Sequence, residues 1–220
     1  MQTRRPWLHR ASVTAVSAAA LVAMAAPADA ATAAQTSTTT ATSTTTATAT
    51  SAAAAADVDY GTWQKDCQAV MDQALPYLKQ RIAAQKPGEK QAIVFDIDNT
   101  ALETDFGFAY PQPANKPVLE AARYAQERGV ALFFVTARPD IIASFTQYNL
   151  KQTGYQVSGL YVRNFIDLFK NVADYKTAQR VDVERKGYTI IANIGNSATD
   201  LSGGHAERTF KLPDYDGQLS

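Results

Sequence analysis

Stretches of strand length that are apolar almost throughout alternate with stretches of helix length, and this alternation restricts the fold more than any other feature. The predicted strands are residues 91–97, 130–136, 159–163, 188–195 and, at the end, 207–212. Strands that are apolar on both faces and separated by helices are typical of a parallel sheet covered on both sides. The sequence therefore predicts an α/β fold of three layers with a mainly parallel sheet.

Proline and glycine mark the ends of the predicted helices. These helices are residues 116–129, 139–154 and 172–187, with one more at 59–75 before the first strand. Proline is tolerated in the first turn of a helix, and glycine readily adopts the left-handed conformation that ends one. Pro76 either starts a second helical turn or kinks the first helix. Cys67 shares one helical face with Trp63 and Met71, so we predict that it is a core residue and not a nucleophile.

Residues 1–30 have the features of an export signal. Three arginines precede an alanine-rich apolar run, and Ala28-Asp29-Ala30 is a cleavage site of the A-x-A type. The pair Arg4-Arg5 followed by Trp7 fits a twin-arginine signal, but ordinary signals also carry paired arginines, so both export routes stay open. Since no second hydrophobic span follows, we expect a secreted protein without a stable membrane anchor.

Residues 31–56 contain only eleven Ala, eleven Thr, three Ser and one Gln. Such a segment buries too little apolar surface to offset the entropy lost on ordering, so we predict a disordered linker.

Residues 57–220 then form one domain. Without the three arginines and Asp29 of the signal, 21 basic and 21 acidic residues become 18 and 20. This balance argues against a nucleic-acid polymer as a partner. The oligomeric state stays open.

Polar side chains collect where predicted strands end. Asp96 and Asp98 follow the apolar part of the first strand, Thr136 ends the second, and Asn196 follows the fourth. Ligands of open parallel sheets bind beyond the carboxyl ends of the strands. We therefore expect these side chains to meet in one site.

Two carboxylates at this position suit phosphoryl transfer. Asp96 can attack phosphorus as a nucleophile and form an acyl phosphate. Asp98 can protonate the leaving oxygen as a general acid and then deprotonate water as a general base. Two acids this close repel each other unless a cation sits between them or one of them holds a proton. Hard oxygen ligands suit Mg²⁺, and Asn196 and Asp200 could complete its ligand set with Asp96 and Asp98.

Further residues can hold the phosphate. Thr136 offers a hydroxyl to a phosphoryl oxygen, and Lys176 offers a fixed positive charge. Ala137 follows Thr136 in the predicted phosphate-binding segment. Arg138 is a candidate for contact with the substrate, and it could equally pair with a nearby acid.

The stretches "VFDIDNTALET", "FFVTAR", "YKTAQR" and "NIGNSATDL" resemble the haloacid dehalogenase (HAD) superfamily. More narrowly, residues 57–220 are similar to its secreted acid phosphatases of subfamily IIIB, the group of the plant acid phosphatases and vegetative storage proteins. The resemblance implies a HAD-like fold, a nucleophile at Asp96 and an acid/base at Asp98, with Thr136 and Lys176 in the remaining catalytic positions. It also implies Mg²⁺ bound by the Asp96 carboxylate, the Asp98 backbone carbonyl and an acid of the fourth motif.

The fourth motif departs from the family pattern. The family has G-D-x-x-x-D, whereas this chain has Asn196 after Gly195 and then Asp200. Asn196 keeps a carbonyl oxygen but lacks the negative charge, and Mg²⁺ prefers charged oxygens. We therefore expect a working enzyme that binds Mg²⁺ more weakly. A phosphate-binding relative with little activity, and a phosphotransferase with the same intermediate, stay open as alternatives.

The composition excludes other phosphatase chemistries. After removal of the signal, His205 is the only histidine, which leaves no nucleophilic or metal-binding histidine set. Cys67 has no phosphate loop after it. A receiver domain uses similar residues, but export and the D-x-D-x-T pattern argue against it.

The segment between the first motif and the next helix shapes access to the site. With about fifteen residues it is too short for a cap domain, so we expect an open site for a small phosphomonoester. Its aromatic residues Phe106, Phe108 and Tyr110 could stack on a substrate ring, but packing of the loop onto the sheet edge is the favoured prediction.

Overall fold

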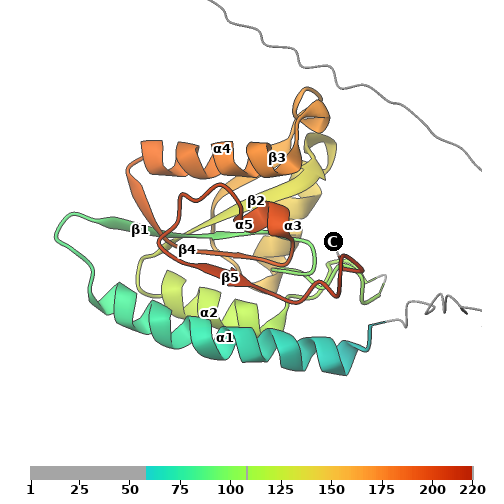
Figure 1. Ribbon diagram of the computed structural model, residues 1–220, viewed down its shortest axis with the longest axis horizontal. Coiled ribbons are helices and arrows are strands. Elements are labelled where there is room, and N and C mark those ends of the chain that lie inside the picture. The colour runs from blue at the N-terminus through green and yellow to red at the C-terminus, as the bar shows by residue number, and fades with distance from the viewer. Residues whose placement is uncertain (1–57, 108, 220) are drawn as a thin grey trace, which may run out of the picture. The chain divides into compact units, whose positions relative to one another are not determined.

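A five-stranded parallel sheet forms the centre of the computed structural model, which describes residues 58–107 and 109–219 (Figure 1). Its elements, in chain order, are α1 (Tyr60–Ala83), β1 (Lys90–Phe95), α2 (Lys116–Gln126), β2 (Ala131–Pro139), the 3₁₀ turn η1 (Asp140–Ile142), α3 (Ala143–Thr153), β3 (Val157–Arg163), the 3₁₀ turn η2 (Asp167–Phe169), α4 (Val172–Arg185), β4 (Tyr188–Gly195), α5 (Ala198–Leu201) and β5 (Thr209–Lys211). The predicted signal at 1–30 and the linker at 31–56 lie outside the described residues.

The strand order is β3-β2-β1-β4-β5, and every neighbouring pair is parallel. The chain runs outward from β1 to β3 on one side and then returns to β4 on the other side of β1. Such a reversal opens a crevice at the carboxyl ends of the two strands that flank it. This topology confirms the predicted α/β fold, and it places the crevice where Asp96 and Asn196 follow β1 and β4.

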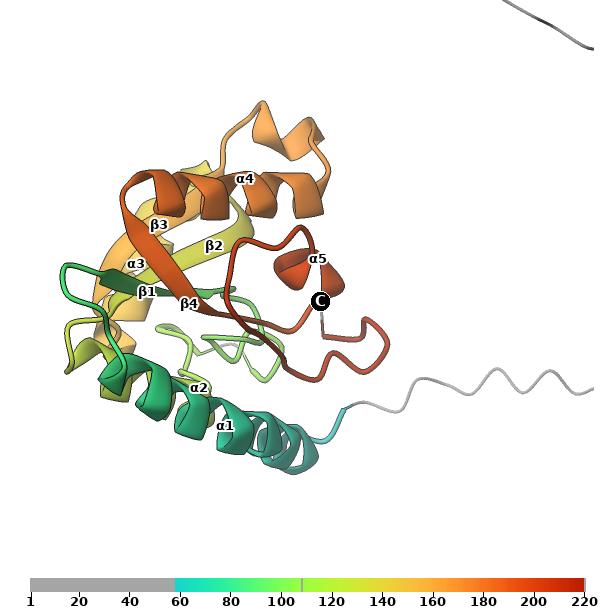
Figure 2. The same ribbon diagram turned by 60° about the vertical axis from the view of Figure 1, so that its left-hand side comes forward.

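Helices cover both faces of the sheet. Figures 1 and 2 show α1 and α2 side by side on one face and α4 on the other. Along β1, Ile93 and Phe95 belong to the core cluster under α1, α2 and α3, whereas Ala92 and Val94 belong to the cluster under α4. Successive side chains of a strand point to opposite faces, so a strand between two helical layers must be apolar throughout.

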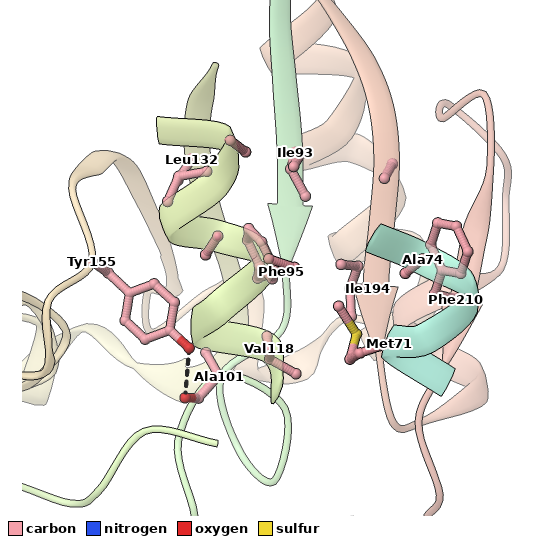
Figure 3. Close-up of a cluster of buried hydrophobic side chains, with 14 of the residues drawn as sticks. Met71, Ala74, Ile93, Phe95, Ala101, Val118, Leu132, Tyr155, Ile194 and Phe210 are labelled. Atoms are coloured by element: carbon pink, nitrogen blue, oxygen red, sulfur yellow. Dashed lines mark hydrogen bonds between the residues drawn. The ribbon is translucent and has the colours of Figure 1, made fainter. Parts of the chain in front are cut away.

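The larger core cluster joins helices, sheet and site loop (Figure 3). Phe95 and Phe134 stack with ring centroids 5.6 Å apart. The Tyr155 hydroxyl donates to the carbonyl oxygen of Ala101 at 3.0 Å, which fixes the loop after β1 against the core. The loop that carries the first motif is therefore tied to the sheet by a buried hydrogen bond.

The N-terminal helix is one unbroken element that runs through Pro76. Its buried positions recur at helical spacing and include Trp63, Cys67 and Met71, as predicted. Pro76 cannot donate to the carbonyl of Asp72, but both residues are exposed, so water can satisfy that carbonyl. Burial raises the pKa of the Cys67 thiol to about 12, in agreement with a core role.

The helix predicted from residue 139 begins later than expected. Pro139 is the last residue of β2 and pairs with Arg163, and η1 precedes α3, which starts at Ala143. The Pro139 ring is compatible with a strand end, so the proline marks the end of β2 and not the start of the helix. In the part of the chain that the structure describes, no helix combines the length and hydropathy needed to cross a membrane.

Candidate active site

Asp96, Lys176 and Asp200 meet at the carboxyl end of the sheet. Asp96 follows β1, Lys176 projects from α4, and Asp200 lies in α5. The Lys176 Nζ atom donates to Asp96 Oδ1 at 2.6 Å and to Asp200 Oδ1 at 2.5 Å, and all three side chains are buried. The second oxygen of Asp96 has no hydrogen-bond partner among the described residues.

Burial and charge act in opposite directions on this cluster. Burial raises the pKa of the Asp96 carboxyl above its ordinary value, while the adjacent Lys176 ammonium favours the ionised form. Burial also opposes the charged form of Lys176, but Asp96 and Asp200 outweigh it and raise the pKa of the ammonium. The lysine is therefore held as a cation between two acids.

Local structure fixes Asp200 in this cluster. The Ser197 backbone N–H donates to Asp200 Oδ2 at 2.8 Å, and the Ser197 side chain caps the short helix α5. A side chain at Gly195 would overlap the Asp200 carboxylate, which explains why glycine ends β4. The buried Arg180 guanidinium donates to the Asp200 carbonyl oxygen at 2.8 Å. Both carboxylate oxygens of Asp200 are thus engaged within the protein.

Asp98 is bound by a second cation. Arg138 donates from Nη2 to Asp98 Oδ1 at 2.7 Å and from Nε to both carboxylate oxygens at 3.1 Å. The Thr104 hydroxyl adds a hydrogen bond of 2.8 Å to the same carboxylate. Burial works against the ionised form of Asp98, but the hydrogen bonds and charge of Arg138 lower its pKa overall. Of the two predicted roles of Arg138, this geometry favours the pair with an acid.

Thr136 and Ala137 differ in their access to the site. Thr136 is buried, and its hydroxyl accepts a hydrogen bond of 3.2 Å from the Arg138 backbone N–H. Ala137, the next residue of β2, lines the cleft above Asp96 and Lys176. The phosphate-binding roles of Thr136 and Ala137 stay predictions.

Asn196 is engaged at both ends of its amide. Its Oδ1 accepts from the Thr100 hydroxyl at 3.2 Å, and its Nδ2 donates to the carbonyl oxygen of Leu219. The Asn99 side chain donates to the same carbonyl at 3.2 Å. The C-terminal segment therefore returns to the site and is bound there by two asparagines, an arrangement that no local sequence signal reveals.

These residues surround a cleft of about 470 Å³. Its lining includes residues that sequence reasoning missed: Asn99, Thr104, Asp105, Val172, Ser197 and Thr199. Asp105 accepts a hydrogen bond of 2.8 Å from the Asn99 side chain, and the Asp105 backbone N–H donates to Asn99 Oδ1. Asn99 adopts a left-handed backbone conformation (φ 50°), which is more common for asparagine than for most other residues. A D-N-T sequence at a strand end is a weak signal for such a turn.

The donor set fits a hard divalent cation in type and charge. Four carboxyl groups lie at the site, those of Asp96, Asp98, Asp105 and Asp200, together with the cations Lys176 and Arg138, so the formal net charge with every group ionised is minus two. Oxygen donors of this kind suit Mg²⁺. Within residues 58–107 and 109–219, however, no three His, Cys, Asp or Glu side chains form a preassembled metal cluster.

The fold and the site define an α/β protein with paired acids and a lysine at the carboxyl edge of a parallel sheet. Residues 14–112 and 109–218 match the family model for the HAD superfamily, subfamily IIIB (acid phosphatase). Because this match covers most of the sequence, the chain belongs to that family. The predicted family is therefore confirmed.

Curated relatives of the chain occur in Glycine max. The stem 28 kDa glycoprotein is 38% identical over 90 residues, which cover 39% of this chain and 35% of the relative. A stem 31 kDa glycoprotein is 26% identical over 175 residues, which cover 69% of this chain and 67% of the relative. The chain thus spans about a third of the 28 kDa relative and about two thirds of the 31 kDa relative.

Solved structures with the same fold include a class C acid phosphatase from Bacillus anthracis. Its TM-score is 0.57 at 16% identity, with 71% of this chain and 80% of that chain covered. The crystal structure of the class C acid phosphatase from the same organism with tungstate bound gives a TM-score of 0.56 at 15% identity, over the same shares of both chains. At this identity the likeness establishes the fold.

The aromatic residues of the loop after the first motif have separate environments. Phe106 stacks on Trp63 of α1 with ring centroids 4.4 Å apart, so it packs the loop onto a helix and not onto the sheet edge as predicted. Phe108 lies outside the described residues. Tyr110 is exposed and contacts Phe145 and Tyr148 of α3. Between β1 and α2 the described residues form no helix or strand beyond isolated bridges, which agrees with the absence of a large cap.

Proposed function

We propose that the chain is a secreted Mg²⁺-dependent phosphomonoesterase, an acid phosphatase that works through a phosphorylated Asp96. The observation that carries this proposal is the environment of Asp96. One of its oxygens is held by Lys176 at 2.6 Å, while the residue lines an open cleft together with Asp98. Membership of the acid phosphatase subfamily supports the same reaction.

The first half of the reaction transfers the phosphoryl group to the protein. The free oxygen of Asp96 forms a bond to phosphorus as the bond from phosphorus to the ester oxygen breaks. Asp98 supplies the proton with which the alcohol leaves. Lys176 holds the carboxylate in position and, together with Thr136, stabilises the negative oxygens of the phosphoryl group.

The second half restores the enzyme. Asp98, now ionised, removes a proton from water, and the resulting hydroxide attacks phosphorus and releases inorganic phosphate from Asp96. Arg138 restrains the Asp98 carboxylate between these steps. Oxygen atoms of Asp96, Asp98 and Asn196 would hold the Mg²⁺ ion, with Asp200 nearby. The ion would neutralise part of the negative charge on the phosphoryl oxygens.

A phosphate-binding relative with little activity is the second candidate. The observation that favours it is Asn196, whose amide is engaged with Thr100 and Leu219 and brings no charge to the metal ligands. The intact Asp96, Asp98 and Lys176 favour the enzyme, because a binding protein does not need a nucleophile. A phosphotransferase would differ only in using an alcohol in place of water.

Hydrolysis of a chromogenic phosphomonoester separates these candidates. The purified chain would be compared with Asp96→Asn and Asn196→Asp, each with Mg²⁺ and with chelator, at acid and neutral pH. Turnover that chelator and Asp96→Asn both abolish is the expected result. Binding of tungstate without wild-type turnover, with turnover only in Asn196→Asp, would identify a phosphate-binding relative instead.

The proposed export accounts for the N-terminal quarter of the chain. Residues 1–30 would be removed as a signal near Ala30, residues 31–56 would act as a spacer, and residues 57–220 would form the catalytic domain. Mass spectrometry of the protein from the culture medium tests this. A mature N-terminus near residue 31 is expected, whereas recovery of the full chain only from cells would contradict export.

A further inference from the structure

Exposed apolar side chains are concentrated beside the proposed active site. Of the ten large apolar side chains that are exposed in the described residues, only Tyr60 lies elsewhere. The other nine are Tyr110, four residues of segment 141–148 and four of segment 165–169. Soluble proteins expose scattered apolar residues, but a gathering of this kind marks a binding surface.

The two segments are neighbours in space. Pro139, at the end of β2, pairs with Arg163, at the end of β3, and the two segments follow directly after these residues. Both therefore leave the sheet at its carboxyl edge, where Asp96 also lies. Segment 165–169 is held in shape by the buried Arg163 guanidinium, which donates to the carbonyl oxygens of Asp167 and Lys170.

A groove of about 880 Å³ joins part of this apolar surface, namely Tyr110, Ile142 and Phe145, to the reactive groups. Its lining includes Asp98, Thr104 and Asp105, which also line the cleft around Asp96 and Lys176. Its walls include Tyr110 and Phe145, the latter 64% exposed. Because the proposed general acid lies where cleft and groove meet, a phosphate bound at Asp96 would direct its leaving group into the groove.

Most polar groups of the groove are already paired within the protein. Arg138 binds Asp98, the Gln112 side chain at 2.9 Å and the Thr146 hydroxyl at 3.3 Å. The Gln112 backbone N–H donates to Asn149 at 2.8 Å. A polar leaving group such as a nucleoside would find few free partners and would lose hydrogen bonds to water. A hydrocarbon leaving group makes no hydrogen bonds to water, so it would lose none on entering the groove.

We propose that this groove binds the hydrocarbon chain of an amphiphilic substrate, a phosphate monoester of a long-chain alcohol. The inference rests on the proposed phosphomonoesterase function and specifies its substrate class. Hydrolysis breaks the bond between phosphorus and the ester oxygen, and water supplies the hydroxyl of the phosphate and the proton of the released alcohol. The chain lies against the walls formed by Ile142 and Phe145.

A series of n-alkyl phosphates from ethyl to octyl, kept below their micellar concentrations, tests the proposal. Burial of a methylene in a half-open groove raises kcat/KM about twofold, so octyl phosphate should exceed ethyl phosphate by about 30- to 100-fold. Adenosine 5′-phosphate serves as the polar comparator, and octyl phosphate should exceed it. A flat series, or a clear preference for the nucleotide, would overturn the proposal.

Two phenylalanine variants test whether the preference for long alkyl chains arises in the groove. Phe145→Ser, inside the groove, should reduce the ratio of octyl to ethyl phosphate turnover by about tenfold. Phe165→Ser is the matched control, because Phe165 is similarly exposed (73%) but does not line the groove. The control should leave the ratio unchanged. Equal losses in both variants would show that general surface hydrophobicity, and not the groove, produces the preference.

Binding of n-alkylphosphonates, which cannot be hydrolysed, separates this inference from the proposed function. Titration calorimetry would measure the affinities of ethyl- and octylphosphonate for the full chain with Mg²⁺. A preference for octylphosphonate that Phe145→Ser removes, without any turnover of esters, would refute the enzyme and support the groove. Turnover of ethyl phosphate with equal affinity for both phosphonates would refute the groove alone.

Discussion

Asp96 and Asp98 are separated by one residue, yet each belongs to a different half of the site. Asp96 is buried with Lys176 and Asp200, which come from α4 and α5. Asp98 faces the open groove and pairs with Arg138, at the far end of β2. One half is closed by core elements and the other is bordered by loops and by the exposed face of α3.

This difference matches the two tasks of the proposed reaction. A nucleophile benefits from a fixed position and from a cation that does not move, and burial provides both. An acid/base must exchange protons with the leaving group and water, so it needs contact with the groove. Substitutions in the buried half should therefore affect stability most, and substitutions in the open half should affect catalysis most.

Lys176→Met should produce the largest change, because it leaves two buried carboxylates without their cation. Removing one partner of a buried ion pair costs about 3–5 kcal/mol. We expect a loss of this size in the free energy of unfolding, measured by urea denaturation, together with loss of activity. Lys186→Met is the control, since its pair with Asp182 is exposed, and it should change stability by less than about 1 kcal/mol. Similar losses in the free energy of unfolding in the two variants would contradict the claim that the buried ion pairs of Lys176 stabilise this half of the site.

Arg138→Gln should impair catalysis and leave the fold largely intact. Without the guanidinium, Asp98 loses its orientation, and kcat should fall about 10- to 100-fold. Arg138 lowers the pKa of Asp98, so its removal raises that pKa. Asp98 then keeps its proton to higher pH, and the alkaline limb of the pH–rate profile should move upward.

Arg128→Gln is the matched control for this variant, since Arg128 packs on the Tyr124 ring away from the cleft. It should leave both kcat and the pH profile unchanged. A pH profile that does not move in Arg138→Gln would show that Asp98 is not the acid that limits the rate.

Asn196→Asp should have the smallest effect on turnover at saturating metal but a clear effect on metal affinity. One added charge next to the cation, at an effective dielectric constant of about 20, should lower the Mg²⁺ concentration for half-maximal activity about tenfold or more. Asn99→Asp loses the same hydrogen bond to Leu219 and serves as the comparison. Saturation of the wild type by trace Mg²⁺ would contradict the weakened site.

The fold was largely predictable because its signals are local. The strands from 91 to 195 are apolar on both faces, which only a doubly covered sheet explains, and glycine ends α3 at Gly154, where the backbone is left-handed (φ 105°). Pro139 misled the prediction because a proline is compatible with both a strand end and a helix start.

The site was predicted most fully in its buried half, whereas for Arg138 the sequence left two roles open. Asp96, Lys176 and Asp200 follow strand ends or lie on the helices beside them, so topology alone brings them together. The Asp98–Arg138 pair, the groove beside α3 and the return of Leu219 to Asn196 depend on loop conformation and on contacts between distant segments. No periodicity or spacing in the sequence encodes such contacts.

Chemical trapping of the phosphorylated enzyme tests the central claim most directly. The enzyme would be mixed with a phosphomonoester, quenched in acid during turnover and treated with borohydride, which reduces an aspartyl phosphate to homoserine. Mass spectrometry of the peptide that contains residues 92–104 would then locate the change. We predict homoserine at position 96, and none in Asp96→Asn. Reduction at Asp98, or turnover without any reduced residue, would contradict the account.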